Sequence, residues 1–190
     1  MGLPKEVTKN TLVDYPRLYK LERFIKRTEK LEGEIAEVGV YKGGTAYLIC
    51  SLTQKHVYLF DTFEGMPEVD ATKDTHHKGD FADTSYESVF KLLYGVGHKT
   101  LIQGIFPSAT GHWIKDKTFS LVHLDCDIYP SVKESLEFFY PRMTQGGIIV
   151  LDDYAEPGCP GAKLATDEFL ADKPEVLNLT CQSQAMFVKV

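Results

Sequence analysis

The sequence predicts an α/β fold with a mostly parallel sheet of about seven strands and helices on both faces. Five apolar runs of four to seven residues, rich in Val, Ile and Leu, alternate with segments of helical periodicity. Buried parallel strands have this composition because helices cover both of their faces. Two further extended segments flank a polar turn near the C-terminus and predict an antiparallel hairpin. With 190 residues, 43% of them hydrophobic, residues 1–190 fit one domain with a sizeable core.

Each element has its own signal in the sequence. Leu18, Leu21, Phe24 and Ile25 are spaced as on one helix face, so residues 1–32 are predicted to form an N-terminal helical segment. Apolar strands are expected at residues 34–40, 56–60, 100–103, 120–124 and 147–151. Helical patterns occupy residues 45–52, 86–94 and 131–140 between them. The final hairpin is expected to pair residues 175–180 with residues 185–190.

Composition excludes several classes of protein. Lys and Arg total 21 and Asp and Glu total 27, and the resulting charge of −6 argues against a nucleic-acid-binding surface. No apolar run approaches the roughly 18 residues of a membrane span, and the first ten residues lack the apolar stretch of a secretory signal. The cysteines, which form no CxxC pair, are Cys50, Cys126, Cys159 and Cys181. Free thiols in a reducing compartment are expected, so the predicted location is the cytoplasm.

The segment EVGVYKGGT, residues 37–45, lies between the first predicted strand and a helix, where α/β sheets bind ligands. The dinucleotide pattern GxGxxG would need a glycine at position 41, and this chain has tyrosine there. Glu37 would repel a pyrophosphate but suits a ligand with a cationic end, such as the amino-acid part of S-adenosylmethionine. The alternative is a glycine-rich connector with a solvated Glu37.

A second acidic residue ends the next predicted strand. Asp61 lies 22 residues after Gly39, where an acid can accept hydrogen bonds from ribose hydroxyls. An acid at a strand end can equally be a helix cap. Together with the glycine turn, Asp61 favours a nucleoside ligand.

Four aspartates follow the fourth and fifth predicted strands: Asp125, Asp127, Asp152 and Asp153. In a doubly wound sheet these strands are neighbours about 5 Å apart, so the carboxylates would lie together. Carboxylates that close repel one another unless they are protonated or neutralised. All-oxygen ligands select a hard cation, Mg²⁺ first and Mn²⁺ or Ca²⁺ second. The alternative is a set of separate caps and solvated acids.

The histidines carry weaker signals. His123 lies inside an apolar run and is expected to be a hydrogen-bonded core residue rather than a ligand. His76 and His77 lie in a polar segment, residues 70–83, which is long enough to be a lid or substrate-gathering loop. A plain exposed loop is the alternative for this segment.

Four ordered segments resemble the macrocin O-methyltransferase family: GEIAEVGVYKGGTA, LFDTFEGMP, LVHLDCDIYPSVKESLEFFYPRMTQGGIIVLDDY and PGCPGAKLATDEFL. The resemblance covers roughly residues 33–170. It implies a Rossmann-like class I methyltransferase fold, with an antiparallel last strand, that uses S-adenosylmethionine to methylate hydroxyl groups. Because residues 1–32 are a shorter N-terminal part than antibiotic-tailoring members have, we expect a sugar or another small polyhydroxylated molecule as the acceptor. The resemblance also favours a homodimer.

The resemblance implies a set of site residues. Cofactor contacts map to Glu37, Gly39, Gly43 and Asp61, and the expected set extends to Val40, Tyr41, Gly44, Thr45, Thr62 and Phe63. The implied Mg²⁺ ligands are Asp125, Asp152 and Asp153. Either Asp125 or Asp127 is expected to take the proton of the acceptor hydroxyl, and the sequence does not choose between them.

Features of the sequence argue against two other functions. A nicotinamide-dependent oxidoreductase is disfavoured by Tyr41 and by the acid cluster. A non-catalytic module that keeps the cofactor fold is disfavoured by the intact aspartate set, since a protein without activity has no need of so many uncompensated carboxylates.

Overall fold

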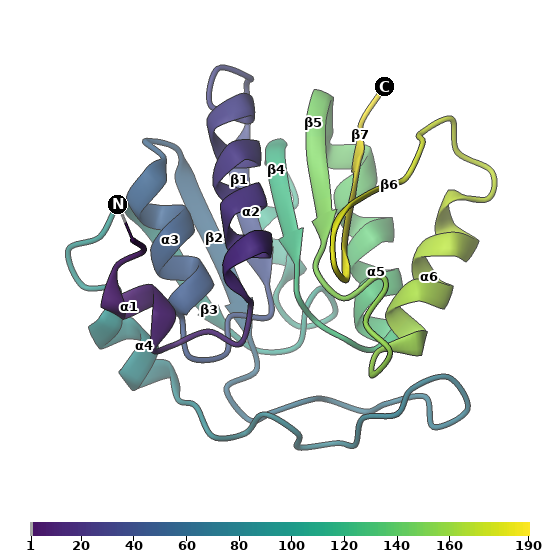
Figure 1. Cartoon of the computed structure of the whole chain (residues 1–190), viewed down its shortest axis with the longest axis horizontal. Coiled ribbons are helices and arrows are strands. Elements are labelled where there is room, and N and C mark those ends of the chain that lie inside the picture. The colour runs from purple at the N-terminus through teal and green to yellow at the C-terminus, as the bar shows by residue number, and fades with distance from the viewer. Residues whose placement is uncertain (1) are drawn as a thin grey trace.

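A seven-stranded sheet in the order β3-β2-β1-β4-β5-β7-β6 forms the centre of the computed structural model, which describes residues 2–190 (Figure 1). The strands are β1 (Glu34–Val38), β2 (His56–Asp61), β3 (His98–Gln103), β4 (Phe119–Leu124), β5 (Met143–Leu151), β6 (Asn178–Cys181) and β7 (Gln184–Val188). The first five are parallel, whereas β7 runs antiparallel to both β5 and β6. The predicted α/β class, the seven strands and the antiparallel last strand are therefore confirmed.

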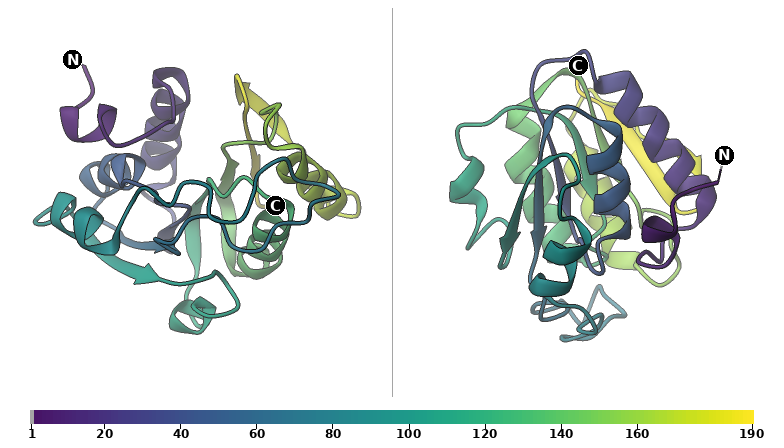
Figure 2. Two further views of the ribbon diagram at one scale, coloured as in Figure 1. Left: turned by 90° about the horizontal axis from the view of Figure 1, so that it is seen from below. Right: turned by 90° about the vertical axis from the view of Figure 1, so that its left-hand side faces the viewer.

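Helices cover both faces of the sheet (Figure 2). They are α1 (Lys5–Thr8), α2 (Tyr15–Thr28), α3 (Gly44–Leu52), α4 (Tyr86–Leu92), α5 (Tyr129–Phe139) and α6 (Pro160–Leu170), with short 3-10 turns at Gly111–Ile114 and Tyr140–Arg142. One apolar core joins α2, α3 and α4 to the sheet, and a second joins α5 and α6 to its other face. Successive strand residues alternate between the cores, as Leu121 and Val122 do, because side chains alternate along a strand.

The boundaries differ from the expectations mainly where glycine and proline occur. Helix α6 was not expected, because PGCPG has the composition of a loop, yet Pro160 occupies its first turn, where the missing N–H costs nothing. Strand β5 begins at Met143 rather than at residue 147, with a register irregularity where it pairs with β4. Helix α2 begins at the N-cap Asp14, whose carboxylate accepts a hydrogen bond from the Arg17 amide at 3.1 Å.

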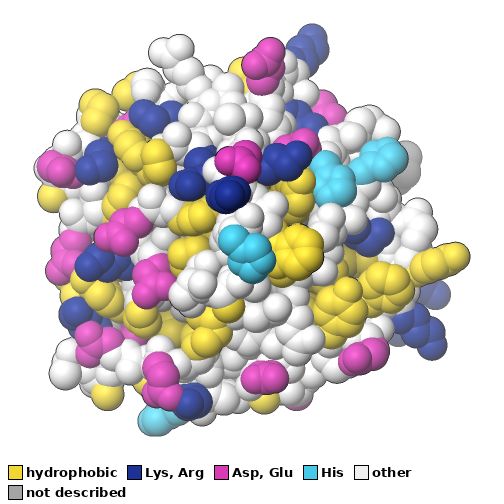
Figure 3. Space-filling model, turned by 180° about the vertical axis from the view of Figure 1, so that it is seen from behind, with side chains coloured by type: hydrophobic (Ala, Val, Ile, Leu, Met, Phe, Trp, Pro, Cys, Tyr) yellow, Lys and Arg dark blue, Asp and Glu magenta, His cyan; other side chains and the backbone are white. Residues whose placement is uncertain are grey.

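On the face shown in Figure 3, acidic, basic and apolar side chains are interspersed. Within residues 2–190, no helix is both long enough and apolar enough to cross a membrane. The expectations of a cytoplasmic location, of a dimer and of no nucleic-acid or membrane partner stay predictions.

Gly39 joins β1 to the following turn at a point where no side chain fits. Its φ is +91°, and a Cβ there would lie 1.7 Å from the backbone oxygen of Asp125. The close approach of the chain after β1 to the chain after β4 therefore depends on this glycine.

We predict that Gly39→Ala destabilises the protein far more than Gly79→Ala. Gly79 has a similar φ of +88°, but a Cβ there would meet nothing within 4 Å. Both variants carry the left-handed backbone cost of about 1–2 kcal/mol, and only Gly39→Ala adds a clash with backbone atoms. Urea unfolding measures the difference. Equal losses of unfolding free energy in the two variants would contradict the close approach of the chain after β1 to the chain after β4.

Candidate functional site

The predicted site residues that follow neighbouring strands come together at one edge of the sheet. Amides just beyond the strand ends continue the parallel ladder, each at 2.9 Å: Gly39 to Phe60, Asp125 to Val38 and Asp152 to Leu124. These bonds hold Gly39, Asp125 and Asp152 side by side on neighbouring segments of the polypeptide. The expectation that β4 and β5 are neighbours is confirmed, and it brings Asp125 beside Asp152 and Asp153.

A cavity of about 340 Å³ lies against these strand ends. Most of the predicted site residues line it: Gly39, Val40, Tyr41, Thr45, Asp61, Thr62, Asp125, Asp127, Asp152 and Asp153. The glycine turn and the aspartate cluster, which are separate signals in the sequence, thus share one cavity.

The other four predicted cofactor residues, Glu37, Gly43, Gly44 and Phe63, lie outside the cavity lining. Glu37 is fully buried, and His123 Nδ1 lies 3.1 Å from its carboxylate oxygen. A Cβ on Gly43 would meet Val89 of α4, and a Cβ on Gly44 would meet the backbone of Asn10. Phe63 is 7% exposed. The solvated Glu37 considered as an alternative is therefore wrong. Its second carboxylate oxygen has no hydrogen-bond partner within residues 2–190, and its expected contact with the cofactor stays a prediction.

Asp61 holds the glycine turn in place. Its carboxylate accepts hydrogen bonds from the amides of Val40 at 2.8 Å, Tyr41 at 2.7 Å and Phe63 at 2.7 Å. Tyr41 has a φ of +50°, a conformation that a non-glycine residue keeps only where surrounding contacts enforce it. Asp61, the last residue of β2, thus binds the turn that follows β1. It also lines the cavity.

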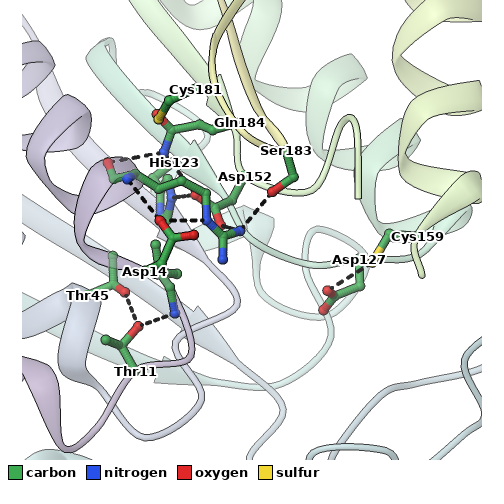
Figure 4. Close-up of polar contacts among 12 residues, drawn as sticks. Thr11, Asp14, Thr45, His123, Asp127, Asp152, Cys159, Cys181, Ser183 and Gln184 are labelled. Atoms are coloured by element: carbon green, nitrogen blue, oxygen red, sulfur yellow. Dashed lines mark hydrogen bonds and ion pairs between the residues drawn. The ribbon is translucent and has the colours of Figure 1, made fainter. Parts of the chain in front are cut away.

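A chain of buried charges runs from Glu37 through His123 and Asp152 to Arg17. Figure 4 labels His123, Asp152 and Gln184 of this region. His123 Nε2 lies 3.5 Å from one Asp152 oxygen, which also accepts a 2.9 Å hydrogen bond from the Gln184 amide. Arg17 donates to the other Asp152 oxygen at 2.5 Å. The expectation of a hydrogen-bonded core role for His123 is confirmed.

Unequal surroundings give the three neighbouring aspartates different protonation states. Burial alone would raise the pKa of Asp152, but the contacts with His123, Arg17 and Gln184 outweigh it and hold the pKa below its usual range. Burial, reinforced by the neighbouring carboxylates, raises the pKa of Asp125 and of Asp153 well above the usual range. The pKa values of Asp125 and Asp153 are thus shifted in the opposite direction from that of Asp152.

The residues present fit a hard divalent cation. Carboxylate oxygens of Asp125, Asp152 and Asp153 all lie within 4.8 Å of one another. Within residues 2–190, no protein donor makes a hydrogen bond to the side chain of Asp125 or Asp153, so both keep oxygens available for another partner. Three carboxylates are the donor chemistry that Mg²⁺ and Mn²⁺ prefer.

Sequence reasoning missed the contribution of the N-terminal segment. Residues 10–13 and Arg17 line the cavity, and the Thr11 hydroxyl lies 3.0 Å from the Thr45 hydroxyl of α3. Arg17 also donates to the Ser183 hydroxyl at 3.0 Å, in the turn between β6 and β7. Helical periodicity marks the buried face of α2, but it carries no signal for a partner 135 residues away.

The loop between β2 and α4 crosses beneath the strand ends towards α6 (Figure 1). Asp74 accepts a 2.8 Å hydrogen bond from the Tyr129 amide at the start of α5, and the Thr75 hydroxyl donates to the Gly158 carbonyl. The loop lines the cavity through His76, Asp80 and Phe81. Residues 70–83 thus line the cavity and contact the starts of α5 and α6, and the expectation of a lid or substrate-gathering loop stays a prediction.

We predict that Arg17→Met destabilises the protein by about 3 kcal/mol, because it leaves Asp152 without its cation in a buried site. Asp152 is fully buried and the Arg17 side chain is 12% exposed. The matched control is Lys42→Met at the exposed Lys42–Asp83 pair, where the loss should be much smaller. Urea unfolding compares the two variants, and similar losses would show that the Arg17 pair is not a buried interaction.

A second prediction concerns pH. Because the pKa values of Asp125 and Asp153 are raised in the folded state, their contribution to stability is full below the ordinary carboxyl pKa. It is lost as pH rises through the raised values. Melting in a chelator should therefore show stability that falls as the pH rises above the ordinary carboxyl range. Asp153→Asn should flatten this decline, whereas Asp116→Asn on an exposed loop should leave it intact; an unchanged slope in Asp153→Asn would contradict the assignment.

Comparison with known proteins identifies the family to which the chain belongs. The family described as macrocin-O-methyltransferase (TylF) matches residues 3–174. A tetracenomycin 4'-O-methyltransferase of Streptomyces olivaceus is 29% identical over 178 residues, which are 80% of this chain and 66% of that protein. Demethyldecarbamoylnovobiocin O-methyltransferase of Streptomyces niveus is 26% identical over 184 residues, 85% of this chain and 68% of that protein. The chain thus spans about two thirds of the length of these relatives.

Solved structures share the fold. The O-methyltransferase NovP superposes with a TM-score of 0.79 at 22% identity, covering 95% of this chain and 82% of its own. CalS11, a calicheamicin methyltransferase, gives a TM-score of 0.80 at 20% identity, covering 99% of this chain and 86% of its own. These likenesses confirm the class I methyltransferase fold. With a family match over residues 3–174, the chain belongs to the macrocin O-methyltransferase family.

Proposed function

We propose that the protein is an S-adenosylmethionine-dependent O-methyltransferase that needs a divalent cation and methylates a hydroxyl of a sugar or a similar small polyhydroxylated molecule. One observation carries this proposal. The glycine turn after β1 and the aspartates after β4 and β5 line the same cavity, so a nucleoside cofactor and a cation-dependent acceptor would be neighbours.

The cofactor end of the cavity is the turn after β1. Gly39, Val40, Tyr41 and Thr45 line it together with Asp61 and Thr62. Because Asp61 already accepts three backbone hydrogen bonds, its carboxylate is fixed before any ribose hydroxyl arrives. Glu37 acts from behind the wall, where its contact with His123 orients the side chain next to Asp152. We therefore assign Glu37 a positioning role towards His123, and its expected contact with the cofactor stays a prediction.

Asp125, Asp152 and Asp153 would hold the divalent cation. A bound cation would lower the pKa of an acceptor hydroxyl and orient it for attack on the sulfonium methyl group. The three carboxylates would exchange the protons on Asp125 and Asp153 for the cation, and Arg17 would keep Asp152 ionised throughout.

Asp127 is the group we assign as the general base. The structure separates it from Asp125: Asp125 groups with Asp152 and Asp153, whereas Asp127 groups with His76 and Cys159. Its φ of +56° is a strained backbone conformation, and its side chain lines the cavity. In the transfer, the hydroxyl oxygen bonds to the methyl carbon, the methyl–sulfur bond breaks, and the hydroxyl proton passes to Asp127. S-adenosylhomocysteine and the methyl ether leave.

The acceptor class is supported by the names of the relatives. The Streptomyces olivaceus protein is named for a rhamnosyl-tetracenomycin, and a third relative, from Micromonospora griseorubida, is a mycinamicin III 3''-O-methyltransferase. The third is 24% identical over 174 residues, 67% of its length. In this chain, apolar side chains such as Met66, Phe81 and Ile105 line the cavity together with the aspartates. A glycoside presents both kinds of surface, hydroxyls and an apolar ring or aglycone.

We predict that S-adenosylhomocysteine binds the purified protein and that Mg²⁺ raises the melting temperature of this complex further. Asp125→Asn should remove the Mg²⁺ increment and leave the affinity for S-adenosylhomocysteine within about threefold, because the cofactor contacts are on β1 and β2. The control is Asp116→Asn, which should keep both the affinity for S-adenosylhomocysteine and the Mg²⁺ increment in melting temperature. Calorimetric titration and melting curves measure the two effects. No binding of S-adenosylhomocysteine would overturn the proposed activity; binding without any Mg²⁺ effect, with a glycoside present, would overturn the metal requirement.

A further inference from the structure

Three side chains that the proposed reaction does not need as a group meet at the wall of the cavity. His76 comes from the loop between β2 and α4, Asp127 follows β4, and Cys159 immediately precedes α6. The Cys159 sulfur lies 3.5 Å from His76 Nε2 and 3.4 Å from Asp127 Oδ1 (Figure 4 shows the second contact). All three potential ligand atoms lie within 4.8 Å of one another.

These distances match the edges of a tetrahedral zinc site. Zinc binds sulfur at about 2.3 Å and nitrogen or oxygen at about 2.0 Å, so tetrahedral angles separate sulfur from either atom by about 3.5 Å. The two separations from the Cys159 sulfur, 3.5 Å and 3.4 Å, therefore match two edges of such a site, and the third edge is shorter than 4.8 Å. A site of three protein ligands leaves the fourth position free, and here it would face the cavity that all three residues line.

A fourth side chain orients the histidine as metal sites require. Asp80 Oδ2 lies 3.4 Å from His76 Nδ1, the ring nitrogen that points away from Cys159. Asp80 is itself fixed, because it accepts a 2.8 Å hydrogen bond from the His77 amide. A carboxylate on Nδ1 favours the tautomer whose free electron pair is on Nε2, facing Cys159 and Asp127.

We propose that His76, Asp127 and Cys159 form a second metal site, specific for a borderline or soft divalent cation such as Zn²⁺. It is separate from the three-aspartate cluster, whose all-oxygen ligands suit Mg²⁺. One nitrogen, one sulfur and one carboxylate oxygen are a ligand set that Mg²⁺ does not favour and Zn²⁺ does. The two sites would thus bind different cations within one cavity, Mg²⁺ at the aspartates and Zn²⁺ at the His–Asp–Cys set.

Binding at this site replaces one proton with one metal ion. In the metal-free protein the Cys159 thiol donates to Asp127. On binding, the S–H proton leaves to solvent, a metal–sulfur bond forms, and His76 and Asp127 supply the other protein ligands. No electron is transferred, so the step needs no oxidant or reductant.

The site would join the loop between β2 and α4 to the body of the protein. Two weaker contacts already connect them there, from Asp74 to Tyr129 and from Thr75 to Gly158. A bound Zn²⁺ would add covalent-like links to both α5 and α6 segments and would occupy the carboxylate of Asp127. Resting on the proposed role of Asp127 as the base, we infer that Zn²⁺ at this site inhibits methyl transfer.

The test uses Co²⁺ as a spectroscopic probe on the reduced, chelator-treated protein in excess Mg²⁺. We expect near-ultraviolet absorption from a thiolate-to-cobalt bond, together with the visible bands of a four-coordinate ion, both removed by equimolar Zn²⁺. Cys159→Ser should remove the near-ultraviolet band, while Cys181→Ser should keep it. An unchanged band in Cys159→Ser, or no such band in the parent protein, would overturn the proposal.

Zn²⁺ affinity, measured by competition with a chromophoric chelator, tests the remaining residues. His76→Ala should weaken binding at least 100-fold, and Asp80→Asn by about 10–100-fold, as expected for removal of a ligand and of its orienting partner. His77→Ala, one residue from His76 and largely exposed, should change little. Far-ultraviolet circular dichroism confirms that each variant is folded. Equal affinities in His76→Ala and His77→Ala, or a loss seen only in Asp153→Asn, would place Zn²⁺ elsewhere.

A kinetic arm separates this site from the proposed activity. With a glycoside acceptor and excess Mg²⁺, micromolar Zn²⁺ should inhibit the parent protein, and Cys159→Ser should relieve the inhibition. A protein that binds Co²⁺ through Cys159 but shows no methyl transfer would refute the proposed function and leave the metal site standing. Inhibition that persists in Cys159→Ser would refute the inhibitory role.

Discussion

Repulsion among the aspartates at the ends of β4 and β5 is the constraint on which the rest of the site depends. Two ionised carboxylates within 4.8 Å of each other repel by at least about 3 kcal/mol at an effective dielectric constant of 20. That is a large share of the 5–15 kcal/mol by which a typical domain is stable. Contacts with His123 and Arg17 hold the pKa of Asp152 below its usual range despite its burial, whereas burial and the neighbouring carboxylates raise the pKa of Asp125 and of Asp153. The N-terminal helix and the C-terminal hairpin thus both serve the site, since Arg17 and Gln184 reach Asp152 from them.

The sequence predicted the elements whose signals are local. Apolar runs located β1 to β5, and the aspartates that follow β4 and β5 had to meet once those strands were neighbours. The Glu37–His123 pair was within reach of the same reasoning, because each residue lies one position before the end of its strand and the two are register partners in adjacent strands. Arg17 was not, because nothing in the pattern of α2 specifies which distant carboxylate its side chain meets. Helix α6 was hidden by glycines and prolines at its start, and the position of Cys159 beside Asp127 was hidden with it.

The cavity contains two groups of potential metal ligands with different chemistry. Three aspartate oxygens suit a hard cation, and the His–Asp–Cys set suits a softer one. The groups are joined through the chain itself, since Asp125 and Asp127 are two residues apart. A cation bound at one group would therefore change the electrostatic field at the other.

In the proposed function, the strand-end aspartates hold a divalent cation beside a nucleoside cofactor. The most direct measurement is a crystal structure of the protein with S-adenosylhomocysteine and Mn²⁺, using the anomalous signal of manganese to locate the ion. We expect one strong peak coordinated by Asp125, Asp152 and Asp153, with the nucleoside against the turn formed by residues 39–41. Bound nucleoside with no peak at these aspartates at saturating Mn²⁺, or a peak elsewhere in the cavity, would contradict the claim.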